Sequence, residues 1–200
     1  MIKEYFFPTI IYAKDLENAK QLNKYLEEHI INWSKQDKGL DKTNVNGWHS
    51  KTDMNHRKEY EPIIQELFKM QHEVIEEEHL DIKPKLGNMW ANINLPNGYN
   101  NGHAHPNSLF SGVYYVKSKP DSGRLQVMDP RPGAQLVMPP RKKGPVPRQL
   151  WREAYFEPVP GRLIMFPSWL WHKVEINKSN DIRISISFNF ILWFLKHKNI

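Results

Sequence analysis

Apolar and polar residues alternate along the chain with two different periods, and the period changes near Pro84. Before that point, apolar residues recur every three or four positions in two segments, Leu16–Trp33 and Tyr60–Leu80. This spacing places them on one face of a helix. The pattern therefore predicts two amphipathic helices, the first of them with Asp15 as its N-cap.

The remainder of the N-terminal half is expected to be irregular. Residues 1–14 read as an extended segment, and a polar loop, Ser34–Arg57, joins the two helices. Trp48 and His49 stand out in this loop as candidates for an aromatic lip over a cleft. A loop anchored by one buried tryptophan is the simpler interpretation.

After Pro84 the pattern is typical of short strands separated by turns rich in Gly, Pro, Asn and Asp, such as Pro96-Asn97-Gly98. The expected strands are Leu86–Leu95, Phe110–Lys117, Arg124–Met128, Ala134–Met138, Arg152–Glu157, Leu163–Phe166, Trp171–Ile176 and Ile182–Trp193. Such a series predicts a mainly β protein with N-terminal helices, in which two helices pack on a jelly-roll, cupin-like barrel. We expect one domain over 1–200, with a helical support region at 1–82 and the barrel core at 83–195.

In the last expected strand, apolar and polar residues alternate strictly. Ile182, Ile184, Ile186 and Phe188 alternate with Arg183, Ser185, Ser187 and Asn189. Because successive side chains of a strand point to opposite faces, the second set shares one face. If that face lines the barrel interior, the barrel encloses a polar cavity, and its polar groups need a bound ligand or water as hydrogen-bond partners.

Composition limits the class of protein and the kinds of metal site that the chain can form. The 200 residues are 40% hydrophobic and 12% aromatic, which indicates a globular chain. There is no cysteine, so disulfides and thiolate metal sites are excluded, and a transition metal must be held by imidazole, carboxylate or water. No apolar run resembles a secretory signal or reaches membrane-spanning length. The expectation is a cytoplasmic protein that does not enter membranes.

The formal net charge is +6, and six basic residues cluster in the segment Arg131–Arg152. This segment is either a solvated loop or a patch that selects an anionic protein, nucleotide or metabolite. No helix-turn-helix, zinc-finger or RNA-binding signature supports a nucleic-acid partner. Near the C-terminus, Trp193, Phe194 and Leu195 can pack against a second subunit, which would make the protein a dimer.

Three histidines and one arginine carry the candidate chemistry. His103 and His105 are two residues apart, so on a strand both point to one face, and His172 begins a late strand. Imidazole suits iron, zinc, copper and nickel. Arg183 can grip a carboxylate with two parallel hydrogen bonds, and Ser185 on the same face can donate a third. The pattern favours one metal and one dicarboxylate, although a salt bridge to an internal carboxylate also explains Arg183.

His172 followed by Arg183-x-Ser185 resembles the distal half of the 2-oxoglutarate and Fe(II)-dependent oxygenase superfamily. The resemblance extends, over nearly the whole chain, to a group of 2OG-Fe(II) oxygenases of bacteria and phages. It is carried by Phe7-Pro8-Thr9, Gly47-Trp48-His49-Ser50, His103-Ala104-His105-Pro106, Ser111-Gly112-Val113-Tyr114-Tyr115-Val116, Asp129-Pro130-Arg131, Phe166-Pro167-Ser168-Trp169-Leu170 and Arg183-Ile184-Ser185.

The resemblance implies a double-stranded β-helix that binds Fe(II), 2-oxoglutarate and dioxygen. The implied reaction hydroxylates an unidentified substrate and releases succinate and CO2. Arg183 and Ser185 would hold the distal carboxylate of 2-oxoglutarate. Further candidates for binding it lie on flanking strands: Tyr114, Tyr115, Asn92 and Asn94. Core or cross-strand packing is the simpler role for each of these four. For a phage-encoded chain, the implied location is the host cytoplasm.

The chain departs from the superfamily pattern at the proximal metal site. The usual His-x-Asp or His-x-Glu is replaced by His103-Ala104-His105. Three arrangements follow. His103, His105 and His172 all bind the metal, which is the favoured one; or one of the proximal histidines binds with a water in the carboxylate's place; or Asp129 supplies the carboxylate.

Two other classes of function compete with the oxygenase. One is a non-catalytic jelly roll that binds a ligand or forms part of a virion. The other is a cupin-like metal enzyme, such as a three-histidine dioxygenase or an isomerase, that works without 2-oxoglutarate. The cupin-like metal enzyme gives no reason for Arg183 and Ser185 to share a face with His172.

Overall fold

The structure, a computed structural model, describes residues 1–17, 19–136 and 139–192. Its elements in chain order are β1 (Tyr12–Asp15), α1 (Ala19–Gln36), β2 (Asn44–His49), η1 (Met54–His56), η2 (Lys58–Tyr60), α2 (Glu61–Glu77), β3 (Lys85–His103), β4 (Phe110–Lys117), β5 (Leu125–Met128), α3 (Pro132–Leu136), η3 (Arg148–Leu150), β6 (Glu153–Phe156), β7 (Arg162–Pro167), β8 (His172–Val174) and β9 (Arg183–Ile191).

The nine described strands form one sheet in the order β1-β7-β4-β9-β3-β8-β5-β6, and β2 also pairs with β3. Every ladder in it is antiparallel. The sheet curls strongly, as is evident from the residues of both of its halves that line one common cavity. This arrangement confirms the predicted mainly β barrel with two packing helices.

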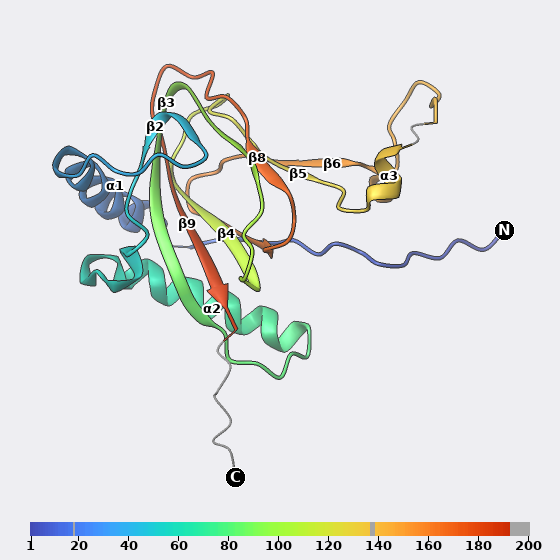
Figure 1. Cartoon of the computed structure of the whole chain (residues 1–200), viewed down its shortest axis with the longest axis horizontal. Coiled ribbons are helices and arrows are strands. Elements are labelled where there is room, and N and C mark those ends of the chain that lie inside the picture. Colours follow the sequence, from blue (N-terminus) through green and yellow to red (C-terminus); the bar gives the residue numbers. More distant parts are fainter. Residues whose placement is uncertain (18, 137–138, 193–200) are drawn as a thin grey trace, which may run out of the picture.

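Both long helices lie on the same side of strands β3, β9 and β4 (Figure 1). Leu26 of α1 and Leu67 of α2 are fully buried in one core with Ile186 and Phe188 of β9. The predicted helices are therefore confirmed, since their apolar faces cover the outside of the sheet. None of the helices in the described part of the chain combines the length and apolarity needed to cross a membrane.

The predicted helix cap at Asp15 is wrong. Asp15 is the last residue of β1, and its carboxylate accepts hydrogen bonds of 2.7 and 2.8 Å from the Arg162 guanidinium. Arg162 lies directly opposite it on β7. The strand pairing continues to Asp15, so α1 begins only at Ala19.

The alternation of β9 is confirmed. Ile184, Ile186 and Phe188 belong to the core beneath the helices. The other face lines the cavity, with Arg183, Ser185, Ser187 and Asn189. Because β9 lies between β3 and β4, its two faces separate the apolar core from the polar interior of the barrel.

The predicted turn at Pro96-Asn97-Gly98 is wrong, because β3 continues through it to His103. Asn97 has a φ of 67°, which kinks the strand without reversing it. The kink is held from outside: Asn97 N–H donates to the Asn177 carbonyl at 2.7 Å, and Asn177 N–H donates to the Gly98 carbonyl at 2.9 Å. The result is one long strand whose far end carries His103.

Two further predictions fail. The expected loop Ser34–Arg57 contains β2, which pairs with β3. The expected strand Ala134–Met138 is replaced by α3, since Met128 of β5 already pairs with Glu153 of β6 and the chain between them leaves the sheet; residues 137–138 lie outside the described part. The last strand ends at Ile191, and the proposed dimer contacts Trp193, Phe194 and Leu195 also fall outside the described residues.

Gly112 offers a test of the packing between the core and the cavity. A Cβ at this position would lie 2.2 Å from Phe188 Cζ and 2.5 Å from the Ile164 carbonyl oxygen. Gly112→Ala is expected to lower the free energy of unfolding by about 1–3 kcal/mol, as overpacking does. Urea unfolding measures this. Gly133→Ala in α3 is the matched control, since nothing lies within 4 Å of its added Cβ; equal effects of the two changes would contradict the packing described.

Candidate metal centre

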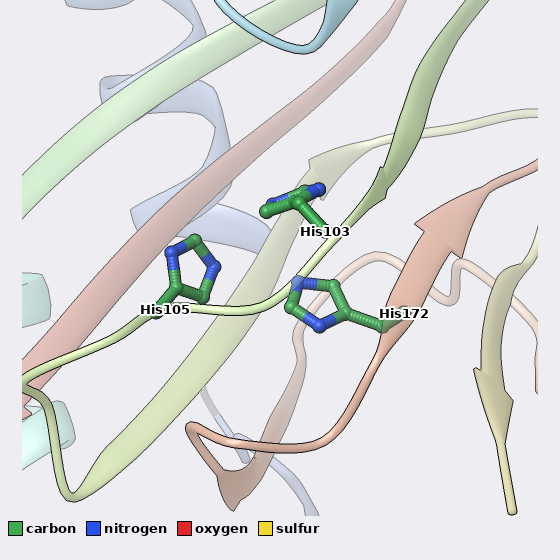
Figure 2. A group of neighbouring side chains, drawn as sticks. All are labelled: His103, His105 and His172. Atoms are coloured by element: carbon green, nitrogen blue, oxygen red, sulfur yellow. The ribbon is translucent and has the colours of Figure 1, made fainter. Parts of the chain in front are cut away.

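Three histidine side chains converge at one end of the barrel interior (Figure 2). His103 is the last residue of β3, His105 follows it by two residues, and His172 is the first residue of β8. One ring nitrogen from each can be chosen so that all three lie within 4.8 Å of one another. The ring centroids of His103 and His172 are 4.4 Å apart, and those of His105 and His172 are 5.1 Å apart.

The backbone explains why these residues meet. His103 and His172 are directly opposite each other in the ladder between β3 and β8, so their side chains share a face. His105 lies beyond the end of β3, so the alternation of a strand does not set its position. Its N–H donates to the Ser168 carbonyl at 2.9 Å, and this bond ties the segment after β3 to the turn before β8.

Two of the rings have their tautomer fixed by backbone carbonyls. Nδ1 of His103 lies 2.8 Å from the Asn101 carbonyl oxygen, and Nδ1 of His172 lies 2.8 Å from that of Leu170. A carbonyl oxygen only accepts, so in each ring Nδ1 carries the hydrogen and donates it. The lone pair of each neutral ring is then on Nε2, as a metal ligand requires.

Burial keeps the cluster uncharged. It lowers the pKa of His172 to about 3, with a further contribution from the nearby His103. Burial and then His103 likewise lower the pKa of His105 to about 4, and burial lowers the pKa of His103. Neutral imidazoles bind cations, so the three side chains form a preorganised site for a transition metal ion.

The histidines line a cavity of about 350 Å³ inside the barrel. Its described lining contains two permanent cations, Lys42 and Arg183, and no aspartate or glutamate. Both predicted groups, the histidines and the polar face of β9, therefore open onto the same space.

Three of the residues predicted to bind a co-substrate lie in a row across the sheet. Ser185 of β9 is directly opposite Tyr115 of β4 on one side and directly opposite Asn92 of β3 on the other. Residues paired in this way have side chains on one face, about 5 Å apart. All three line the cavity, and Arg183 lies one step along the same face of β9.

Arg183 is 1% exposed. Its Nη1 donates to the carbonyl oxygens of Ser122 and Gly123 at 2.6 and 2.9 Å. Gly123 permits this approach, because its φ is +88° and a Cβ there would lie 2.8 Å from Nη1. Burial lowers the pKa of Arg183 to about 10, which leaves it charged at neutral pH.

The structure contradicts the alternative explanation of Arg183, in which it forms a salt bridge with an internal carboxylate. Its guanidinium pairs with no carboxylate of residues 1–17, 19–136 or 139–192. A buried, charged group with only neutral acceptors is costly. Arg183 is thus a ready partner for an anion in the cavity.

Asp129, the alternative metal ligand, is not part of the histidine group. Its carboxylate accepts hydrogen bonds of 2.9 and 2.6 Å from the Arg131 guanidinium. Nor does the basic segment that follows it cap the cavity. None of the described residues between Arg131 and Arg152 is part of the cavity wall.

Two aromatic residues beside the metal centre complete the wall. His49 of β2 stacks on Trp90 of β3, with ring centroids 5.5 Å apart, and Trp90 in turn contacts His105 at 5.7 Å. His49 and Trp48 were both candidates for an aromatic lip over a cleft, but Trp48 packs in the core against Trp33. Trp90 was missed, although Asn88, Trp90 and Asn92 alternate with apolar residues in the same way as the polar face of β9.

The sequence comparison identifies the family. Residues 88–189 match the family described as "Putative 2OG-Fe(II) oxygenase". These residues span β3 to β9 and include all three histidines and Arg183. The chain belongs to this family of 2OG-Fe(II) oxygenases, and its cofactors are Fe(II) and 2-oxoglutarate. No protein with curated information matches the sequence.

Solved structures share the fold. A prolyl-4-hydroxylase of Pseudomonas putida superposes with a TM-score of 0.61 and 14% identity, over 92% of this chain and 92% of its own. A viral collagen prolyl hydroxylase from Paramecium bursaria Chlorella virus-1, in complex with 2OG, gives 0.58 and 14%, over 90% and 94%. HygX of Streptomyces hygroscopicus, with nickel and 2-oxoglutarate bound, gives 0.65 and 8%, over 93% and 84%.

These similarities confirm the predicted jelly-roll class of the oxygenase superfamily. They give no support to a non-catalytic or virion-associated barrel. The bound groups fit the residues of this chain as well, since neutral imidazoles converge on one point and an unneutralised, buried arginine faces the same cavity.

The buried histidines predict how stability depends on pH. Their folded-state pKa values lie below the unfolded value of about 6.5, so the unfolded chain binds more protons and metal-free protein loses stability as pH falls. Between pH 7 and pH 5 we expect a loss of about 2 kcal/mol for each of His105 and His172. Urea unfolding of the metal-free protein at both pH values measures it.

His172→Gln is expected to reduce this loss by about one histidine's share, because glutamine takes up no proton. His72→Gln, at an exposed position on α2, is the matched control. A stability that does not change between pH 7 and pH 5 would contradict the burial of the cluster.

Proposed function

We propose that this protein is an Fe(II)- and 2-oxoglutarate-dependent hydroxylase in which His103, His105 and His172 hold the metal. One observation carries the proposal: the three histidines and Arg183, whose guanidinium has no carboxylate partner among the described residues, line a single cavity. The prolyl hydroxylases among the similar folds support hydroxylation as the reaction. The substrate is a separate question, because folds at this level of identity host different reactions.

Arg183 and Ser185 are proposed to bind the distal carboxylate of 2-oxoglutarate. A guanidinium forms charge-assisted, paired hydrogen bonds with a carboxylate, and these are strongest where water is excluded. The Tyr115 hydroxyl, in the same row of the sheet, is a further donor for that carboxylate, and burial raises its pKa to about 12, so it keeps its hydrogen.

Asn92 fits the same role through its amide. Its Nδ2 lies 3.2 Å from Ser187 Oγ, while its Oδ1 is buried without a partner. Rotation of the amide by half a turn lets Oδ1 accept from the Ser187 hydroxyl and places Nδ2 at the buried position that Oδ1 occupies in the structure. The Asn92 Nδ2 can then donate a hydrogen bond to an anionic co-substrate, and Oδ1 is no longer without a hydrogen-bond partner.

When bound, Fe(II) and 2-oxoglutarate supply the oxidising chemistry: dioxygen is consumed, 2-oxoglutarate is converted to succinate and CO2, and a C–H bond of the substrate becomes C–OH. The residues of the chain have other tasks. The carbonyls of Asn101 and Leu170 orient the metal-binding rings. Arg183 sets the direction of the co-substrate, and the barrel wall excludes bulk water.

The direct test is an anaerobic titration of metal-free protein with Fe(II) and then 2-oxoglutarate, following the visible charge-transfer band of the chelate. We expect the band in the wild type and none in His172→Ala. Arg183→Ala is expected to weaken 2-oxoglutarate binding about 30-fold or more, since it removes one partner of a buried charge pair.

A comparison with 2-oxobutanoate, which lacks the distal carboxylate, separates recognition from folding. The wild type should strongly prefer 2-oxoglutarate, and Arg183→Ala should lose that preference. Arg124→Ala, which breaks an ion pair with Glu175 outside the cavity, is the matched control. Folded protein that forms no band with Fe(II) and 2-oxoglutarate would overturn the proposed function.

A second set of variants tests the ligand assignment. If three histidines bind, His103→Ala and His105→Ala each lower the affinity for Fe(II), or for Ni(II) as a stable substitute, at least about tenfold. Asp129→Asn then leaves it unchanged. Isothermal titration calorimetry under anaerobic conditions distinguishes the arrangements. Loss of affinity in Asp129→Asn would make Asp129 the ligand, and an unchanged affinity in either histidine variant would exclude that histidine.

A further inference from the structure

One wall of the cavity comes from the segment that leads into β2. The chain folds back here, because Leu40 N–H donates to the His49 carbonyl at 2.8 Å. Asn101 N–H donates to the Thr43 carbonyl, also at 2.8 Å, which fixes this segment beside the end of β3 that carries His103. Lys42, Thr43 and His49 all line the cavity as a result.

Lys42 brings an unneutralised charge to this wall. Its side chain forms no ion pair with any carboxylate in the described part of the chain. The charge of Lys42 also acts on a buried residue of the cavity wall, His49. Burial lowers the pKa of His49, and the positive charge of Lys42 lowers it further. Thr43 lines the same wall, and a threonine hydroxyl can donate a hydrogen bond to a ligand.

The charges of the assembled site do not balance. Histidine ligands are neutral, whereas the carboxylate usual at the proximal position would carry one negative charge. Fe(II) and Arg183 together contribute three positive charges and 2-oxoglutarate two negative ones, so a positive charge remains, and Lys42 adds another. The described lining contains no aspartate or glutamate, and Lys42 is an exposed residue at its edge, so the excess positive charge favours a ligand that carries a negative charge.

We propose that the substrate of this oxygenase carries an anionic group, a carboxylate or a phosphate, that binds against Lys42 and Thr43 at the mouth of the cavity. This inference rests on the proposed function, since it counts the bound metal and co-substrate. It also places anion recognition on the segment before β2 and not on the basic segment from Arg131 to Arg152, of which no described residue lines the cavity.

Paramagnetic relaxation tests the proposal without turnover. The protein is loaded with Co(II) and saturated with 2-oxoglutarate, and loading is verified first by the Co(II) absorption spectrum and by its loss in His172→Ala. Inorganic phosphate and acetate are then added as probes, and the relaxation of ³¹P and of the acetate ¹³C is measured. A probe held in the cavity lies near Co(II) and relaxes faster.

We expect saturable enhancement for at least one probe, and about fivefold weaker binding in Lys42→Gln, as expected for one partly exposed ion pair. Lys143→Gln is the matched control, because it removes the same charge from the basic segment outside the cavity. Enhancement of phosphate alone assigns a phosphate-bearing substrate, and enhancement of acetate alone assigns a carboxylate.

Two results overturn the inference while leaving the proposed function intact. One is a loaded protein that enhances neither probe. The other is enhancement that Lys42→Gln and Lys143→Gln change equally, which would mean direct binding to the metal or a general effect of charge. Protein that does not load Co(II) and 2-oxoglutarate would show a different failure, that of the proposed function, and the inference would fall with it.

Discussion

The structure depends on one constraint, which is that β9 is buried on both faces. β9 lies between β3 and β4, the apolar core under the helices covers one of its faces, and the barrel interior lies against the other, so most of its side chains are buried and need partners inside the protein. Its apolar residues find one in the core under α1 and α2. Its polar residues can find partners only in the barrel interior, where they line the cavity.

The ladders around β9 then determine the chemistry of that cavity. Pairing with β3 and β4 brings Asn92 and Tyr115 to either side of Ser185, and the kinked continuation of β3 carries His103 opposite His172. The interior that results holds neutral imidazoles and an arginine without a carboxylate, both of which reduce the stability of the empty protein. The cost falls on the residues proposed to bind the metal and the co-substrate, as is common at functional sites.

The sequence predicted the structure best where a single rule, burial of one face of a helix or strand, determines the pattern of residues. Alternation identified the polar face of β9, and the spacing of three and four identified both helices, because burial on one side dictates those patterns. The arginine, the serine and the three histidines were found in this way and through the family resemblance. Their roles in binding are still predictions.

The rest depends on contacts that a local pattern does not contain. Pro96-Asn97-Gly98 has the composition of a turn, but the loop around Asn177 holds it within β3. His105 lies outside the strands, and its N–H donates to the carbonyl of Ser168, a residue distant in the sequence, which holds it beside His103 and His172. β2 has little apolar alternation of its own and exists because β3 pairs with it, so the place of Lys42 was invisible in the sequence.

The position of β9 also affects how the protein is made. It is the last of the described strands to leave the ribosome, yet it belongs between β3 and β4, which are synthesised much earlier. Until it arrives, those two strands have exposed edges, and such edges favour pairing with other chains. The sheet therefore cannot be completed until β9 has been synthesised, and by then the three histidines of the candidate metal centre are already part of the nascent chain.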